Sequence, residues 1–128
     1  MIGFIKKLAI GAKKMVVLNK VLGDAEIDGH KSKVSSIYIY ITNDEYIFCK
    51  AMGLIEIGRI KIEQVGRITH MTQAEVAYEV SQRVGDACSR TAIGSLPILF
   101  FNDNDGKHIV EIPLMEKSSL SDLYKKIR

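Results

Sequence analysis

From residue 34 onward the chain alternates apolar and polar side chains with a period of two, which is typical of half-buried β-strands. This pattern predicts a strand at 34–41, turn residues at 42–45 and a returning strand at 46–51. Another strand is predicted at 54–62. Its alternation slips near Gly58, which indicates a β-bulge or a close backbone approach.

The second half of the chain continues the series of short strands. The further strands that we predict are 65–72, 75–84, 98–101 and 107–112. Residues 85–96 show no period and carry many small side chains, so a long loop is expected there. The Asp105-Gly106 pair predicts a tight hairpin between the last two strands.

The last residues return to a helical pattern. Leu120, Leu123, Tyr124 and Ile127 follow the spacing of one apolar helix face. Seven or eight sequential strands followed by one helix predict a mainly β domain. We expect a strongly bent antiparallel sheet or partly open β-barrel, with the C-terminal helix covering one open end.

Residues 1–23 are predicted to form a separate amphipathic helix ahead of a domain at 24–128. At 100° per residue, the lysines gather on one face and most apolar side chains on the other. The candidate residues for binding a membrane surface or a partner are Lys6, Lys7, Lys13, Lys14, Lys20, Phe4, Ile5, Leu8, Met15 and Leu22.

Three interpretations of such a helix are open. It would pack on its own domain or a partner subunit, lie on an anionic membrane interface, or serve as a secretory signal. The signal interpretation is the weakest, because Lys13 and Lys14 interrupt the apolar stretch. An isolated helix of this length is marginal in water, so it needs one of these surfaces to fold against.

Composition changes this picture mainly through charge. The 128 residues carry a formal net charge of +3, but the first 23 contain five lysines and no acid. Residues 24–128 hold 13 Lys and Arg against 15 Asp and Glu, so the expected domain is slightly acidic. No apolar run is long enough to form a transmembrane helix. Cys49 stands in an apolar run and is expected to be a buried thiol, which favours a reducing, cytoplasmic compartment.

Two segments resemble the bacterial pleckstrin-homology-like (PH-like) domain family. Residues 39–48 (IYITNDEYIF) resemble a hairpin common in that family, and residues 57–68 (IGRIKIEQVGRI) are similar to its link between two strands. The hairpin around Asp105-Gly106 and the expected closing helix complete the order, and the resemblance covers residues 24–128.

The resemblance implies a bent barrel of about seven strands capped by a helix, used as a binding platform and not as an enzyme. Eukaryotic relatives often hold phosphoinositides with basic residues of the first hairpin. The corresponding loop here, residues 29–33, supplies Lys31 and Lys33 as a candidate anion-binding loop. The strand that follows, residues 36–41, has no Arg or Lys, which departs from a phosphate cradle.

The sequence offers little catalytic or metal-binding chemistry. His30, His70 and His108 have no partner at ligand or triad spacing, so no metal site and no cofactor are expected. Asp103 and Asp105 lie in a turn without the downstream glutamate of a calcium loop. The acidic balance of residues 24–128 also disfavours nucleic acid.

We therefore expect a non-enzymatic PH-like module that binds a protein partner or itself, without a small-molecule substrate. Its N-terminal basic helix would tether it to an anionic lipid surface, at the inner face of the membrane. The alternative is a homo-oligomeric structural subunit in which that helix is the assembly element.

Overall fold

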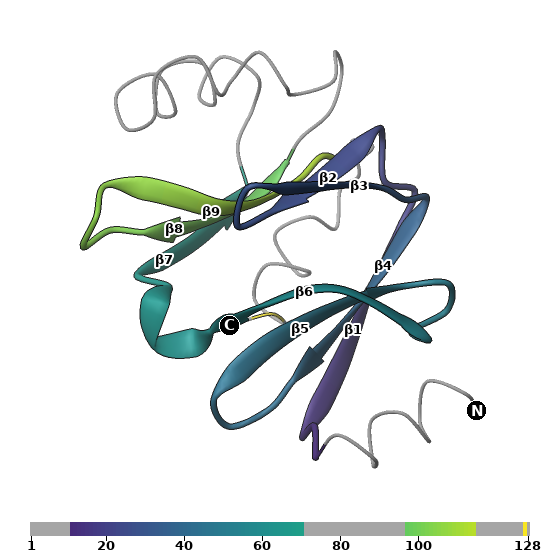
Figure 1. The fold of residues 1–128 in the computed structure, drawn as a ribbon, viewed down its shortest axis with the longest axis horizontal. Coiled ribbons are helices and arrows are strands. Elements are labelled where there is room, and N and C mark those ends of the chain that lie inside the picture. The colour runs from purple at the N-terminus through teal and green to yellow at the C-terminus, as the bar shows by residue number, and fades with distance from the viewer. Residues whose placement is uncertain (1–10, 71–96, 115–126, 128) are drawn as a thin grey trace.

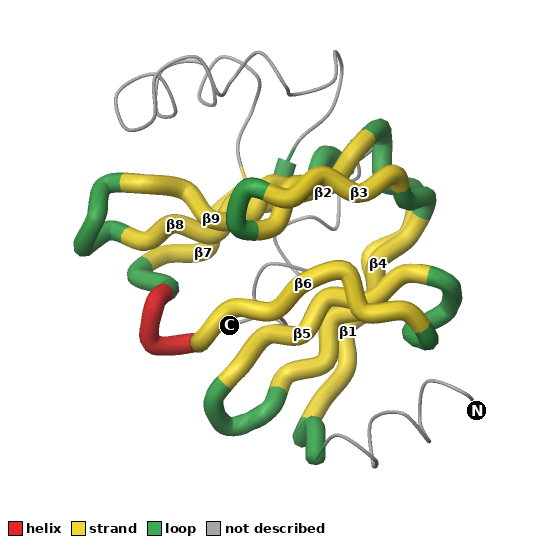
Figure 2. The backbone as a smooth tube through the Cα atoms, in the orientation of Figure 1, coloured by secondary structure: helices red, strands yellow, loops and turns green. Residues whose placement is uncertain are grey.

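The computed structural model describes residues 11–70, 97–114 and 127. These residues form nine strands and one short 3-10 helix, η1 (Figures 1 and 2). The elements are β1 (Lys14–Asn19), β2 (Asp24–Ile27), β3 (His30–Lys33), β4 (Ser36–Ile41), β5 (Glu45–Lys50), β6 (Ile55–Lys61), η1 (Ile62–Gln64), β7 (Arg67–His70), β8 (Ile98–Asn102) and β9 (Lys107–Ile112).

The strands build two antiparallel sheets, which face each other across the core (Figure 1). The first sheet has the order β1-β4-β5-β6, and the second has the order β3-β2-β9-β8-β7. Within the described residues the two sheets do not join into a closed barrel. The fold is therefore mainly β, as predicted, but its architecture is two facing sheets.

One bent hairpin connects the two sheets. Its first arm is β1 in the first sheet and β2 in the second, and its second arm is β3 and β4. Between them, the Val21 amide donates to the carbonyl of Ser35 at 3.0 Å, so hydrogen bonding continues across the bend. Lys20 and Gly23 have positive φ angles of 59° and 88°, and they turn the first arm from one sheet into the other.

Gly58 marks a second place where the sheets meet. A Cβ built on Gly58 would lie 2.7 Å from Cγ2 of Ile27 in β2, so only glycine allows this approach. The register between β5 and β6 also shifts here, because Phe48 pairs with Gly58 and Cys49 pairs with Glu56. The bulge and the close approach predicted near Gly58 are both confirmed.

The core lies between the sheets and takes side chains from both. Phe100 of β8 packs edge-on against Tyr46 and Phe48 of β5, with ring centroids 5.4 and 5.6 Å away. Val16 and Leu18 of β1 belong to the same cluster and are almost fully buried. The chain therefore enters the folded body before residue 24.

Several predicted elements are confirmed closely. The strands expected at 34–41, 46–51, 54–62 and 107–112 correspond to β4, β5, β6 and β9. Cys49 is a buried thiol, as expected. Of the strand predicted at 65–72, residues 67–70 form β7, and residues 71 and 72 lie outside the described residues. The strand expected at 75–84 and the loop at 85–96 lie outside the described residues.

The helix predicted over residues 1–23 is wrong for the part that the structure describes. Residues 14–19 form β1, and Gly11 and Lys20 have positive φ angles that a right-handed helix does not contain. The stretch Met15 to Leu18 includes two adjacent valines, which favour a strand, and it finds a full-length partner in β4. Residues 1–10 lie outside the described residues.

The loop predicted at residues 29–33 is also wrong. The turn consists of Asp28 and Gly29, whose φ angles of 49° and 86° suit a two-residue hairpin turn. His30–Lys33 is strand β3, paired with β2. Most of the predicted C-terminal helix lies outside the described residues. Its Ile127 is described, and this side chain is fully buried in the core cluster.

Candidate binding surfaces

The structure separates the basic residues that the sequence grouped on one helix face. Lys14 begins β1 opposite Ile41, whereas Lys20 follows the other end of the strand. Met15 is half-buried on the outer face of the first sheet, where it packs beside Tyr40. Exposed Lys13 and half-buried Leu22 lie just before and just after this strand region. The candidates Phe4, Ile5, Lys6, Lys7 and Leu8 lie outside the described residues.

Lys31 and Lys33 lie on β3, and each is opposite a carboxylate. Lys31 pairs in register with Glu26, and Lys33 pairs with Asp24. Residues directly opposite on an antiparallel pair have neighbouring side chains, so opposite charges are matched on this hairpin. The two lysines therefore share their surface with two acids, which weakens the potential for holding an anion.

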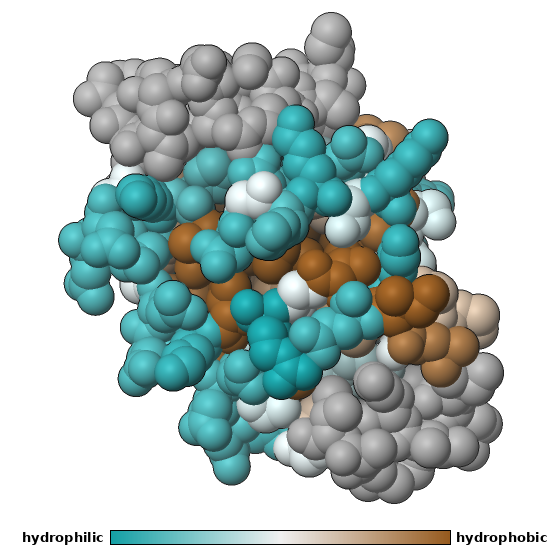
Figure 3. Space-filling model, in the orientation of Figure 1, coloured by the Kyte–Doolittle hydropathy of each residue, from teal (hydrophilic) through white to brown (hydrophobic). Residues whose placement is uncertain are grey.

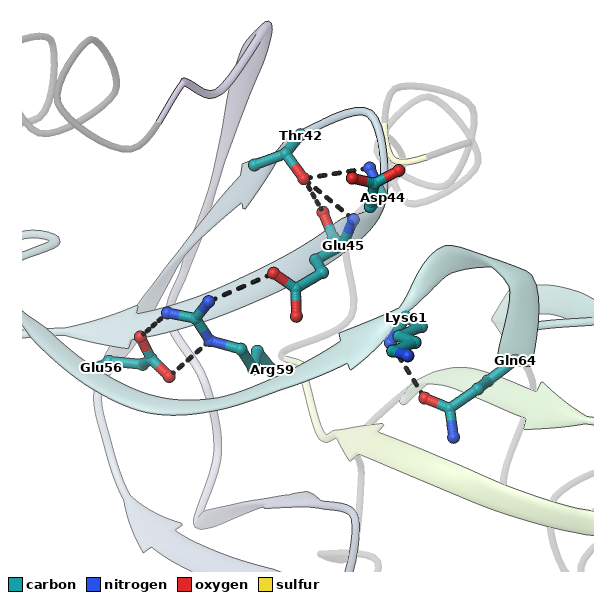
Figure 4. Close-up of polar contacts among 7 residues, drawn as sticks. All are labelled: Thr42, Asp44, Glu45, Glu56, Arg59, Lys61 and Gln64. Carbon is teal, nitrogen blue, oxygen red and sulfur yellow. Dashed lines mark hydrogen bonds and ion pairs between the residues drawn. The ribbon is translucent and has the colours of Figure 1, made fainter.

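Arg59 of β6 is held by two carboxylates at the β4–β5 end of the first sheet (Figure 4). Its Nε donates to Glu56 at 2.9 Å, and its Nη1 donates to Glu45 at 3.2 Å. The hydrogen bonds that Arg59 donates to Glu56 are the main cause that raises the pKa of Arg59 above its ordinary value. The guanidinium charge is already matched, so this arginine is engaged within the chain.

The turn beside Arg59 is organised by one hydroxyl. Oγ1 of Thr42 accepts hydrogen bonds from the amides of Asp44 at 3.1 Å and Glu45 at 2.9 Å (Figure 4). An open hollow of about 600 Å³ lies next to this turn, lined by Asn43, Asp44, Glu45, Lys61, Ile62 and Glu63. The lining holds three carboxylates and one ammonium, and one of these carboxylates, Glu45, is paired with Arg59, so a small excess of negative charge remains.

The second sheet contains a comparable pair that is buried. His108 and Glu111 of β9 lie with Nε2 and Oε1 3.4 Å apart, and their side chains are only 5% and 3% exposed. From the sequence, His108 has no partner at ligand or triad spacing. Its burial next to Glu111 follows from a register shift between Phe100 and Phe101, which the sequence pattern did not reveal.

The most unusual surface is the β5–β6 turn. Met52, Leu54 and Ile55 are 61%, 55% and 50% exposed, and they are the large exposed apolar side chains of the described residues. We call these three residues the apolar tip. Figure 3 shows the corresponding hydrophobic patch at the right-hand side of the molecule, where Figure 1 shows the β5–β6 turn.

The backbone of the turn is fixed by its own contacts. The amide of Gly53 donates to Lys50 and that of Leu54 donates to Ala51, at 3.1 and 3.2 Å. The Tyr40 hydroxyl donates to the carbonyl of Gly53 at 3.4 Å, and a Cβ on Gly53 would collide with this hydroxyl. Burial is the main cause that raises the pKa of Tyr40.

The turn also holds two residues in a conformation that side chains rarely adopt. Ala51 and Met52 have φ angles of 54° and 59°, and Gly53 follows at 87°. Left-handed conformations cost a non-glycine residue roughly 1–2 kcal/mol each. Outliers of this kind, when the surroundings enforce them, often occur at sites that bind something.

The sequence pattern predicts strands at 46–51 and 54–62 and does not single out the apolar tip. The available signal was the composition of the turn. Residues 51–55 read AMGLI and contain no polar side chain, whereas a surface turn normally carries polar ones.

Residues 11–70, 97–114 and 127 contain no group of three or more His, Cys, Asp or Glu placed to hold a metal ion. In the same part of the chain, no helix is long and apolar enough to cross a membrane.

Comparison with protein-family models, with curated proteins and with solved structures finds no match to this chain.

Proposed function

We propose that this protein is a non-enzymatic PH-like binding module that acts at an anionic membrane surface and binds a protein partner there. The observation that carries the PH-like part is the bent hairpin shared by both sheets. A barrel-like domain with two facing sheets needs such a corner, where one hairpin passes from the first sheet to the second.

The strand order supports the same proposal. Each arm of the bent hairpin is one continuous run of chain that passes through two strands. Counted in this way, the nine strands of the described residues make seven runs. β2 then lies beside β9, so the first and last runs are neighbours in the second sheet. Ile127 in the core supports a closing C-terminal element at this domain. Seven bent strands and a closing helix are what the resemblance implies.

The membrane part of the proposal rests on charge and on exposed apolar surface. Five lysines and no acid occur in residues 1–23, and the apolar tip is exposed on the folded body. Basic residues near an anionic surface contribute about 1 kcal/mol each. We place the protein at the inner face of the membrane, held there by such contacts.

Co-sedimentation of the full chain with vesicles tests this proposal. We expect binding to vesicles of equal parts phosphatidylcholine and phosphatidylglycerol, little binding to phosphatidylcholine alone, and release at high salt because charges are screened. Absence of binding to the anionic vesicles at low salt would overturn the membrane part of the proposal.

A homo-oligomeric subunit is the second candidate, and one observation favours it. Among the described strands, β1 is at an edge of the first sheet, where a second chain could pair with it. Sedimentation velocity of the full chain distinguishes the two. A dimer or larger species that persists on dilution would favour the oligomer, and a monomer would count against it.

A further inference from the structure

We propose that the apolar tip is the part of the folded body that inserts into the interfacial layer of an anionic lipid bilayer. This inference rests on the membrane part of the proposed function and names the residues that make the contact. The three side chains are Met52, Leu54 and Ile55, each at least half exposed.

The size and shape of the tip favour a lipid surface over a protein. A stable protein–protein interface buries about 800 Å² on each partner, far more than three side chains at one turn provide. A lipid interface needs no matching shape, because acyl chains and headgroups rearrange around a projecting apolar group. A small apolar projection is therefore better matched to a bilayer.

The charges around the tip also suit anionic headgroups. From Tyr46 to Ile55 the only charged side chain is Lys50. Asn19 of β1 pairs with Ser36, the first residue of β4, and this end of β4 lies beside the end of β5 that enters the β5–β6 turn. Lys20 follows Asn19, so it lies at the same end of the first sheet as the apolar tip. Glu56, the first acid after the tip, is bonded twice to Arg59, which also bonds Glu45, so this cluster of two carboxylates and one guanidinium keeps a single negative charge against the two lysines.

The backbone hydrogen bonds and the rigidity of the turn also suit an environment with little water. Its amides at Gly53 and Leu54 already bond within the turn, so entering the headgroup layer does not strip them of partners. The contact of Gly53 with Tyr40 fixes the loop before binding, so little conformational entropy is lost on insertion.

The test is a variant that removes the apolar surface and keeps the turn. Met52→Asn suits the left-handed conformation, Leu54→Gln is polar at an exposed site, and Ile55→Thr keeps a β-branched strand residue. The matched control exchanges the first two residues, Met52→Leu with Leu54→Met, which preserves apolar area. Circular dichroism establishes that both variants are folded.

In co-sedimentation with the phosphatidylglycerol vesicles, we expect the triple variant to bind roughly tenfold more weakly than the wild type, because it loses most of the inserted apolar area. The exchange control should bind like the wild type. A second variant, Lys20→Asn with Lys50→Gln, should lose about fivefold per lysine and depend less on salt.

The outcomes separate the two proposals. If the wild type does not bind anionic vesicles, the membrane part of the proposed function and this inference both fail. If the wild type binds and the triple variant binds equally well, the inference alone fails and another segment makes the contact. If the triple variant instead abolishes self-association in solution, the tip binds a second copy and the inference is overturned.

Discussion

Glu56 and Arg59 lie three residues apart in the same strand, yet their side chains meet on one face of the sheet. In a regular strand an odd spacing places two side chains on opposite faces. The bulge between them supplies one extra residue and restores them to the same face. His108 and Glu111 repeat this arrangement in β9, where a register shift also lies between the pair.

The two pairs share one geometry and differ in burial. Removing one partner of each pair should therefore lower the free energy of unfolding by different amounts. Replacing Glu56 by Gln should cost less than about 1 kcal/mol, because Arg59 and Glu56 are exposed and screened by solvent. Replacing Glu111 by Ala should cost about 1–3 kcal/mol, because it leaves the buried His108 side chain without this partner.

Urea unfolding of both variants measures this contrast, and the salt dependence provides the control. The small effect at Glu56 should shrink further at high salt, whereas the effect at Glu111 should not. Equal losses of unfolding free energy in the two variants would contradict the conclusion that, of these two pairs, only His108–Glu111 is buried.

Gly58→Ala should destabilise the fold by about 1–3 kcal/mol, since the new methyl group would press on Ile27. The glycine has no positive φ, so the effect is steric and not conformational. A double-mutant cycle with Ile27→Ala checks the cause, because the alanine at residue 58 should cost much less when Ile27 is truncated. Additive losses would place the strain elsewhere.

Phe100 should be among the most sensitive core positions. Phe100→Ala should cost about 3–5 kcal/mol through the cavity it leaves between the sheets. Phe100→Leu keeps most of the burial but loses the edge-on contacts to Tyr46 and Phe48, each of which contributes about 0.5–1.5 kcal/mol. Thermal and urea unfolding should show a larger loss of stability for Phe100→Ala than for Phe100→Leu. The reverse order would contradict the packing of Phe100 between the two sheets.

Tyr40 should make the fold sensitive to alkaline pH. Burial raises its pKa above the ordinary value of 10.0, so the unfolded chain releases this proton first as the pH rises. The stability of the folded state therefore falls as the pH passes from 10.0 toward the raised pKa. Tyr40→Phe should show a weaker decline over the same range, measured by urea unfolding at each pH. An unchanged decline would show that Tyr40 is not responsible.

The later hairpins could be predicted from sequence because their signals are local. Residues 36–41 alternate isoleucine with Ser and Tyr, Thr42 begins a turn before the apolar run of β5, and Asp105-Gly106 separates β8 from β9. Even the bulge at Gly58 was visible, because it breaks the period of two. Local pattern and tertiary structure agree in these segments, so the pattern is sufficient.

The first thirty residues could not be predicted in the same way. Residues 14–19 satisfy both an amphipathic helix pattern and a strand pattern, and their distant partner β4 decides between the two. β2 and β3 are only four residues long. The apolar face of β2 is limited to Ala25 and Ile27, and β3 has no apolar side chain. The Asp28-Gly29 pair was the one available signal for their hairpin.

The candidate site was hidden for a different reason. Sequence patterns indicate which residues are apolar, and they place most of them in the core. That Met52, Leu54 and Ile55 remain exposed depends on the left-handed turn and on the contact between Gly53 and Tyr40. Exposure of an apolar group is a tertiary property, and it becomes visible only in the folded chain.

The measurement that tests the account most directly uses the absence of tryptophan from the sequence. Met52→Trp places a single fluorescent reporter at the apolar tip, and Asn104→Trp places one in the exposed β8–β9 turn as a control. With phosphatidylglycerol vesicles, we predict a blue shift and quenching by brominated lipid for the first variant and neither change for the second. Vesicle binding without any change at residue 52 would contradict the account.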